Sequence, residues 1–138
     1  MKKYCSQYRH CPICSAKLVD GGEDYLICSD SNCSKRLYLS PKPTVSALIF
    51  NDKNQVLLCK GVNPPTKDLW DIPGGFISLD ETAEKATVRE LLEEIGLTIY
   101  DLEYVNSYPC EYLFEGVNYP TLNFVFTVKV KGSSDQTD

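Results

Sequence analysis

The fold is decided by one stretch of the chain, GFISLDETAEKATVRELLEEIGL, which spans residues 75–97. Residues 82–95 within it have the apolar spacing of an amphipathic helix. Asp80 is placed to act as the N-cap, and Gly96 lies where a glycine commonly ends a helix. The stretch therefore predicts one helix between two loops.

A helical projection of residues 82–95 separates two stripes. The apolar stripe is expected to pack against a sheet and comprises Val88, Leu91, Leu92 and Ile95. The opposite stripe comprises Ala83, Ala86, Glu90, Glu93 and Glu94. Its two alanines are expected to leave the surface beside the glutamates open.

The three glutamates have i, i+3, i+4 spacing, which places like charges side by side and destabilises a helix unless a cation compensates. Carboxylate oxygens without His or Cys suit Mg²⁺ or Mn²⁺. A solvated acidic face is the alternative interpretation, and the spacing alone favours it.

A longer sequence pattern favours the metal site over the solvated acidic face. It runs from Gly75 through Glu81 to the segment RELLEEIGL, residues 89–97, and it resembles the complete Nudix box. Its seven fixed and two aliphatic positions arise together by chance on the order of once in a billion windows. The resemblance is close over residues 70–97 and loose over residues 44–130.

The resemblance implies an α+β fold, a Nudix α/β/α sandwich with a mixed sheet. It also implies an enzyme that hydrolyses the pyrophosphate bond of a nucleoside diphosphate linked to another moiety and releases a nucleoside monophosphate. Mg²⁺ or Mn²⁺ is the implied cofactor. The implied metal ligands are Glu90, Glu93 and Glu94, helped by the backbone carbonyl of Gly74.

Catalytic roles are implied for four residues: Glu93, Glu94, Arg89 and Glu81. Arg89 would orient the glutamates through a salt bridge with Glu81. The general base stays open, since Glu94 is one candidate and a glutamate of a later loop, Glu111 or Glu115, is another.

Five of the seven cysteines lie at or before Cys33. Cys11, Cys14, Cys28 and Cys33 form two pairs that suit a structural, tetrahedral Zn²⁺, with free buried thiols as the alternative. The pattern resembles the zinc ribbon that precedes the Nudix domain in bacterial NADH pyrophosphatases, except that the second pair encloses four residues instead of two. We therefore expect a zinc ribbon over residues 1–40 and the Nudix domain over 41–138.

Around the box, strands are expected at 44–50 and 56–59, which form a hairpin, and at 69–72, 99–107 and 121–130. An aromatic-rich loop separates the last two. Four of its side chains are candidates to stack a nucleobase, or equally to pack the loop onto the sheet: Tyr108, Tyr112, Phe114 and Tyr119. Ser107 and Pro109 half-match a Ser-Gln-Pro-Trp motif of NADH pyrophosphatases, so NADH, NAD⁺ and ADP-ribose are all candidate substrates.

The formal net charge is -5 and the sequence pI about 4.9. This acidity argues against nucleic acid as the main partner, and the basic residues of the cysteine module come without an interleaved aromatic stripe.

Neither a secretory signal nor a membrane-spanning run is recognisable, so a cytoplasmic protein without membrane association is expected. Two other functions stay open, a non-catalytic Nudix-like nucleotide sensor and a zinc-ribbon RNA-binding regulator.

The C-terminal part looks short, because 41 residues follow Leu97. The polar tail 132–138 is expected to be disordered. We expect the domain to lack its closing C-terminal helix, and a homodimer is the assembly that would compensate.

Overall fold

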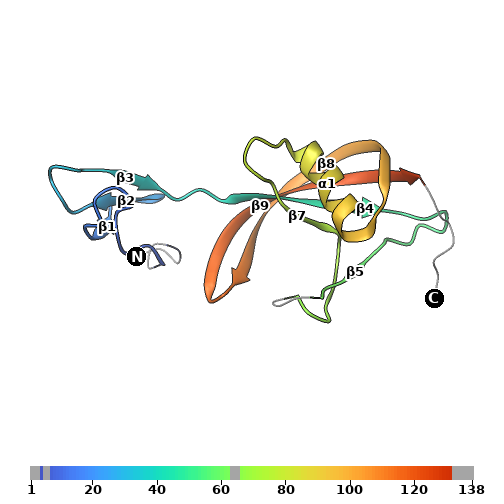
Figure 1. Ribbon diagram of the computed structural model, residues 1–138, viewed down its shortest axis with the longest axis horizontal. Coiled ribbons are helices and arrows are strands. Elements are labelled where there is room, and N and C mark those ends of the chain that lie inside the picture. The colour runs from blue at the N-terminus through green and yellow to red at the C-terminus, as the bar shows by residue number, and fades with distance from the viewer. Residues whose placement is uncertain (1–3, 5–6, 63–65, 132–138) are drawn as a thin grey trace. The chain divides into compact units, whose positions relative to one another are not determined.

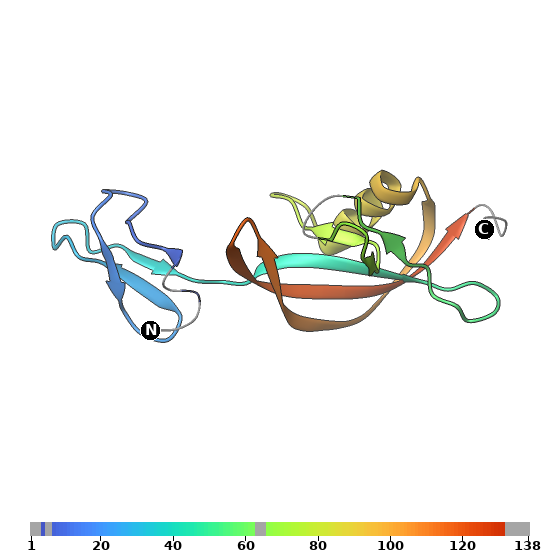
Figure 2. The same ribbon diagram turned by 90° about the horizontal axis from the view of Figure 1, so that it is seen from below.

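The computed structural model describes residues 4, 7–62 and 66–131, so the tail 132–138 lies outside the described residues. The chain divides into two compact units (Figures 1 and 2). The first unit consists of Met1–Pro41 and Glu111–Pro120, and the second of Lys42–Cys110 and Thr121–Asp138. None of the described helices is both long and apolar enough to cross a membrane.

The first unit contains a small antiparallel sheet in the order β1–β2–β3. Its strands are β1 (Leu18–Asp20), β2 (Tyr25–Cys28) and β3 (Arg36–Tyr38). The buried apolar side chains described in this unit are Cys11, Leu26 and Cys28. This core is too small to supply much folding free energy. A metal ion bound by several of the cysteines would supply more of it.

The second unit is built on a four-stranded mixed sheet in the order β7–β4–β9–β8. The strands are β4 (Lys42–Ile49), β7 (Gly74–Phe76), β8 (Thr98–Phe114) and β9 (Val117–Lys131). Strand β4 runs parallel to β9 and antiparallel to β7. One helix, α1, packs on this sheet, so the predicted α+β fold with a mixed sheet is confirmed.

Strands β8 and β9 are longer than the sequence predicts. The segment between residues 107 and 121 is not an aromatic-rich loop, because both strands continue to a tight turn at Glu115 and Gly116. Both turn residues have positive φ angles, 49° and 77°. That backbone matches the twist of a short hairpin and explains why a glycine stands at the second position. Alternating aromatic residues favour a strand here over a loop.

The predicted 44–50/56–59 hairpin is confirmed next to its turn only. The Leu57 N–H donates to the Ile49 carbonyl, the Asn51 N–H donates to the Gln55 carbonyl, and an antiparallel bridge joins Phe50 to Val56. Strand β5 (Cys59–Lys60) instead pairs with β6 (Trp70–Asp71), and Cys59 lies opposite Asp71. This separate two-stranded sheet brings Asp71 beside the start of β7, only three residues further along the chain.

Helix α1 spans Ala83–Ile95 and ends at Gly96, whose left-handed φ of 66° fits the predicted glycine cap. The N-cap is Thr82 and not Asp80, because the Thr82 side chain accepts a hydrogen bond from the Lys85 N–H. Asp80 belongs to the preceding turn and has a positive φ of 62°.

The buried face of α1 differs from the predicted apolar stripe. Leu91 is fully buried as expected, but Val88 and Leu92 are exposed. Ala86 and Thr87 are buried in their place, because small side chains let the helix approach β4 and β7 closely. The residues of the core cluster are Val45, Ala47, Ile49, Ala86, Leu91, Phe126 and Val128. The helix is thus turned so that Glu90 lies at the edge of the buried face.

Candidate active site

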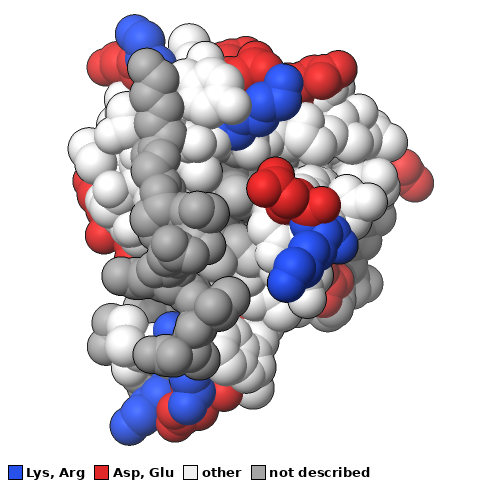
Figure 3. Space-filling view, turned by 90° about the vertical axis from the view of Figure 1, so that its right-hand side faces the viewer, with Lys and Arg blue, Asp and Glu red and all other residues white. Residues whose placement is uncertain are grey.

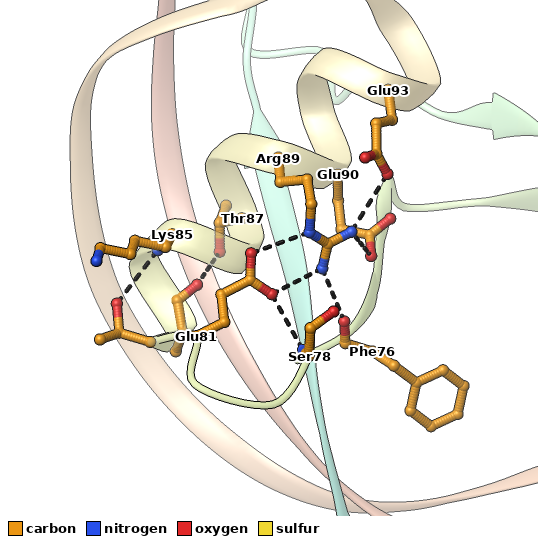
Figure 4. Close-up of polar contacts among 10 residues, drawn as sticks. Phe76, Ser78, Glu81, Lys85, Thr87, Arg89, Glu90 and Glu93 are labelled. Atoms are coloured by element: carbon orange, nitrogen blue, oxygen red, sulfur yellow. Dashed lines mark hydrogen bonds and ion pairs between the residues drawn. The ribbon is translucent and has the colours of Figure 1, made fainter.

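Arg89 lies at the centre of a network of carboxylates on α1 and the loop before it (Figure 4). Its Nε and Nη2 donate to the two carboxylate oxygens of Glu81, at 2.9 and 2.8 Å. Its Nη1 donates to Glu90 at 2.7 Å and to Glu93 at 3.2 Å. A planar guanidinium with several fixed donors suits such multiple recognition better than a lysine would.

The Arg89–Glu81 pair also fixes the loop that leads into the helix. Nη2 of Arg89 donates to the backbone carbonyl of Phe76, and the Ser78 N–H donates to Glu81. Hydrogen bonds from Arg89 and then from the Ser78 N–H lower the pKa of Glu81 to about 2. Glu81 is therefore ionised throughout the neutral range, and its observed contacts are those of a residue that positions Arg89.

Glu90 is held where β7 offers no side chain. A Cβ on Gly75 would lie 2.5 Å from the Glu90 carboxyl carbon. Glycine at this position thus leaves the space that the carboxylate occupies. The Glu90 side chain is only 14% exposed, whereas that of Glu93 is 60% exposed.

Glu94 points toward the start of β7, where its Oε2 accepts a hydrogen bond of 3.1 Å from the Gly74 N–H. Burial raises the pKa of Glu94, and so do the negative charges of Glu90, Asp71 and Glu93. Asp71 is an addition that the sequence analysis did not single out. Asp71 lies in β6, within the predicted 69–72 strand, and three residues before the start of β7.

These observations fit a hard divalent cation. Glu90, Glu93 and Glu94 offer carboxylate oxygens without nitrogen or sulfur, which is the donor set that Mg²⁺ and Mn²⁺ prefer. The mutual repulsion that raises the pKa of Glu94 is relieved when a cation binds nearby. The sequence predicts that Ala86 leaves an open surface beside the three glutamates. This expectation is wrong, because Ala86 is buried.

The four aromatic residues proposed for the substrate do not share one unit. Tyr108 belongs to the second unit and is half exposed. The other three belong to the first unit: Tyr112, Phe114 and Tyr119. The rings of Tyr112 and Phe114 stack with centroids 6.2 Å apart and planes 14° from parallel. This pairing shows that the two rings pack on each other along β8.

The tip of the β8–β9 hairpin is attached to the N-terminal segment within the first unit. The Gln7 side chain accepts from the Asn118 N–H at 2.6 Å and donates to the Asn118 carbonyl at 2.9 Å. The Tyr4 hydroxyl and the Asn118 amide both donate to the Glu111 carboxylate. Glu111, one candidate for the general base, is therefore occupied by partners in this unit.

The four predicted zinc ligands come together. The Sγ atoms of Cys11, Cys14, Cys28 and Cys33 all lie within 4.8 Å of one another. Cys11 and Cys33 are 3.8 Å apart, and Cys14 and Cys28 are 3.3 Å apart. A tetrahedral Zn²⁺ with bonds of about 2.3 Å requires sulfurs about 3.8 Å apart, so the spacing fits. The N–H groups of Cys14 and Ile13 lower the pKa of Cys11 to about 7, whereas burial and the neighbouring thiols raise the pKa of Cys28 to about 12. A bound cation is what would let all four sulfurs be thiolates together.

Curated relatives match part of the chain. A protein from Methanocaldococcus jannaschii named ADP-ribose pyrophosphatase is 48% identical over 62 residues, which cover 45% of this chain and 36% of that protein. A protein from Pseudomonas putida named RNA pyrophosphohydrolase is 44% identical over 62 residues, 45% of this chain and 37% of its own. The chain thus matches little more than a third of the length of these relatives.

Solved structures agree with the fold. A NUDIX hydrolase from Nitrosomonas europaea superposes with a TM-score of 0.63 and 25% identity, over 91% of this chain and 69% of that one. A MutT NUDIX hydrolase from Burkholderia pseudomallei gives a TM-score of 0.59 with 24% identity, over 67% and 70% of the two chains. The family model described as NUDIX domain matches residues 40–138, a range that includes the whole carboxylate network around Arg89. The chain therefore belongs to the NUDIX domain family.

Proposed function

We propose that the second unit catalyses the metal-dependent hydrolysis of a pyrophosphate bond in a nucleoside diphosphate linked to another moiety. The substrate would be of the ADP-ribose or NADH type, and one product a nucleoside monophosphate. One observation carries the proposal. Arg89 holds Glu90 and Glu93, and Glu94 lies next to them against the Gly74 N–H. The name of the Methanocaldococcus jannaschii relative supports ADP-ribose within this class.

Glu90, Glu93 and Glu94 would hold Mg²⁺ or Mn²⁺, together with the backbone carbonyl of Gly74. When bound, such a cation neutralises diphosphate charge and acidifies a coordinated water. Arg89 keeps Glu90 and Glu93 on the same side of the helix, and Glu81 keeps Arg89 in place. These contacts preorganise the carboxylates before the substrate arrives.

Glu94 is the general base that we favour among the three candidates. Its carboxylate lies in the same cluster as Glu90 and beside the Gly74 N–H, so it would receive a proton where the diphosphate is attacked. Glu111 is bound by Tyr4 and Asn118 in the first unit, and Glu115 forms the hairpin turn.

A substrate panel with Mg²⁺ tests the reaction. It should include ADP-ribose, NADH, NAD⁺ and, because of the Pseudomonas putida relative, a 5′-triphosphorylated RNA. Glu93→Gln and Glu94→Gln should each lower kcat by at least about a hundredfold while the fold is retained. Glu84→Gln, an exposed change on the same helix, is the matched control and should keep near wild-type rates. Wild-type rates in both cluster variants would exclude the proposed site.

We also propose that the four clustered cysteines bind one structural Zn²⁺. The purified chain should contain one zinc per molecule by elemental analysis. Cys14→Ser should lose the metal, whereas Cys110→Ser, an exposed cysteine of β8, should retain it. Equal zinc content in both variants would refute this assignment.

A further inference from the structure

One face of the β1–β2–β3 sheet combines aromatic, cationic and aliphatic side chains. In the antiparallel register, Val19 lies opposite Ile27, Ile27 opposite Arg36, and Tyr25 opposite Tyr38. Directly paired residues of neighbouring strands share a face, and residues two apart along a strand do as well. We call this surface the tyrosine–arginine face; it consists of Lys17, Val19, Tyr25, Ile27, Arg36 and Tyr38.

The opposite face of the sheet is the one that is buried. Leu26 and Cys28 belong to it, and both are buried. Asp20 lies opposite Leu26 and so belongs to that face as well. The sheet alternation thus separates an acidic residue from the tyrosine–arginine face. On that face Tyr38 is 62% exposed and Val19 is exposed too, as expected for a surface that is open to a partner.

The aromatic part of the face is closely packed around Tyr25. The rings of Tyr25 and Tyr38 have centroids 5.4 Å apart, and the guanidinium of Arg36 lies 5.5 Å from the Tyr25 centroid. Tyr25 also contacts the β1–β2 turn so closely that a Cβ on Gly21 would lie 2.5 Å from the ring. Tyr25 is therefore fixed between a glycine turn and its two neighbours, while Tyr38 remains available for stacking.

The charge balance differs between the two units. The first unit, residues 1–41 and 111–120, carries six Lys or Arg and six Asp or Glu, whereas the second unit carries eight Lys or Arg against thirteen Asp or Glu. On the side of the molecule drawn in Figure 3, the visible basic side chains of described residues lie beside acidic ones, and further acidic side chains lie apart near the edges. Lys17 and Arg36 on the tyrosine–arginine face thus offer local positive charge within an acidic protein.

We propose that the tyrosine–arginine face binds single-stranded nucleic acid. A base would stack on Tyr38, and the phosphate backbone would contact Arg36 and Lys17. Exposed aromatic rings beside cations are the features that bind single strands without sequence preference. The charge of the face favours a polyanion over an acidic or neutral protein surface of equal size. The site is independent of the pyrophosphatase proposal, because its residues all belong to the first unit.

Fluorescence anisotropy with the full zinc-loaded chain tests the proposal. The probes are fluorescent oligonucleotides of about 12 nucleotides, one RNA and one DNA, without 5′-triphosphate and without added Mg²⁺. We expect micromolar binding at about 50 mM salt that weakens steeply at 200 mM salt. A duplex of the same sequence should bind more weakly, because its bases are already stacked. The RNA and DNA arms show which sugar is preferred.

Single substitutions test whether the oligonucleotide binds at the tyrosine–arginine face. Tyr38→Ala should weaken binding roughly tenfold, and Tyr38→Phe should retain it, because only stacking is required. Arg36→Ala should weaken binding several-fold and reduce the salt slope by about 1. Lys35→Ala removes the same charge one residue earlier, on the opposite face, and Tyr100→Ala removes an equally exposed tyrosine of the second unit. Both controls should bind like wild type.

Zinc content and circular dichroism establish that each variant is folded. The proposal is overturned if folded wild type fails to bind either oligonucleotide at low salt, or if Tyr38→Ala and Arg36→Ala bind as tightly as the controls. Equal affinity for single strand and duplex would also overturn it. Glu94→Gln should bind normally, so the loss of hydrolysis and the loss of nucleic-acid binding can be separated.

Discussion

At the level of single residues, a substitution of Gly75 tests the steric contact between this position and the Glu90 carboxylate. In Gly75→Ala the new Cβ would displace the Glu90 carboxylate, the far end of a flexible side chain, so stability should fall by only about 1 kcal/mol. The proposed activity should fall at least tenfold, with a higher Mg²⁺ requirement, measured by titrating Mg²⁺ at saturating substrate.

A double mutant controls for this interpretation. If the Cβ acts by displacing Glu90, then Gly75→Ala should cost little further activity in a Glu90→Ala background. Additive losses in the double mutant would mean that Gly75 acts through the backbone and not through Glu90.

The ion pair between Arg89 and Glu81 predicts a dependence of stability on pH. The pKa of Glu81 is lowered from its ordinary value of 4.5 to about 2, so the pair stabilises the fold fully above pH 4.5. That stabilisation is lost as the pH falls from 4.5 toward 2. Wild type should melt at a higher temperature than Glu81→Gln at pH 6, and the difference should shrink at pH 3. A difference that is constant or larger at pH 3 would contradict the ion-pair explanation.

Among the elements, the attachment of the β8–β9 tip to the N-terminal segment yields the next prediction. The Gln7 side chain contacts both the N–H and the carbonyl of Asn118, as a neighbouring strand would. In Gln7→Ala the Asn118 amide should exchange with solvent at least about tenfold faster, as measured by hydrogen exchange and NMR. Gln55→Ala, which removes a hydrogen bond with Asn51 in another turn, is the control and should leave that amide unchanged. Unchanged protection in Gln7→Ala would exclude this role.

The sequence predicted well those elements whose structure depends on local chemistry. Helix α1 and its Gly96 cap follow from apolar spacing and from the freedom of glycine at positive φ. Thr82 was missed as the N-cap because Asp80, two residues earlier, is an equally good capping residue by type. The buried face of the helix was also misjudged, since Ala86 and Thr87 are buried by close packing that hydrophobicity does not reveal.

Features that depend on pairing between distant segments were not predicted. The sequence predicts a loop where β8 and β9 extend, because Pro109 and scattered polar residues interrupt the apolar pattern. The cysteine module was predicted to lack an aromatic stripe because Tyr25, Arg36 and Tyr38 are separated along the chain. Only the register of β2 and β3 brings them onto one face. The clustering of the four cysteines, by contrast, followed from their spacing.

For the whole molecule, the two units obtain their stability from different sources. In the second unit a cluster of buried apolar residues between Val45 and Val128 joins α1 to the sheet. In the first unit the described buried apolar side chains are few, and two of them are proposed zinc ligands. Removal of zinc should therefore affect the two units unequally, because only the first depends on the metal for its folding free energy.

A zinc chelator with low affinity for Mg²⁺ tests this inequality by hydrogen exchange. After chelation, the amides of Leu26 and Ile27 in β2 should lose protection, because Cys28 at the end of the strand is no longer fixed by the metal. The amides of Ala47 in β4 and Leu91 in α1 should keep theirs, since the residues around them form a core without cysteine ligands. Returning Zn²⁺ should restore protection in β2. Simultaneous loss of protection in β4 and α1 would show that the two units fold as one, and unchanged protection in β2 would show that the cysteine cluster does not need a metal.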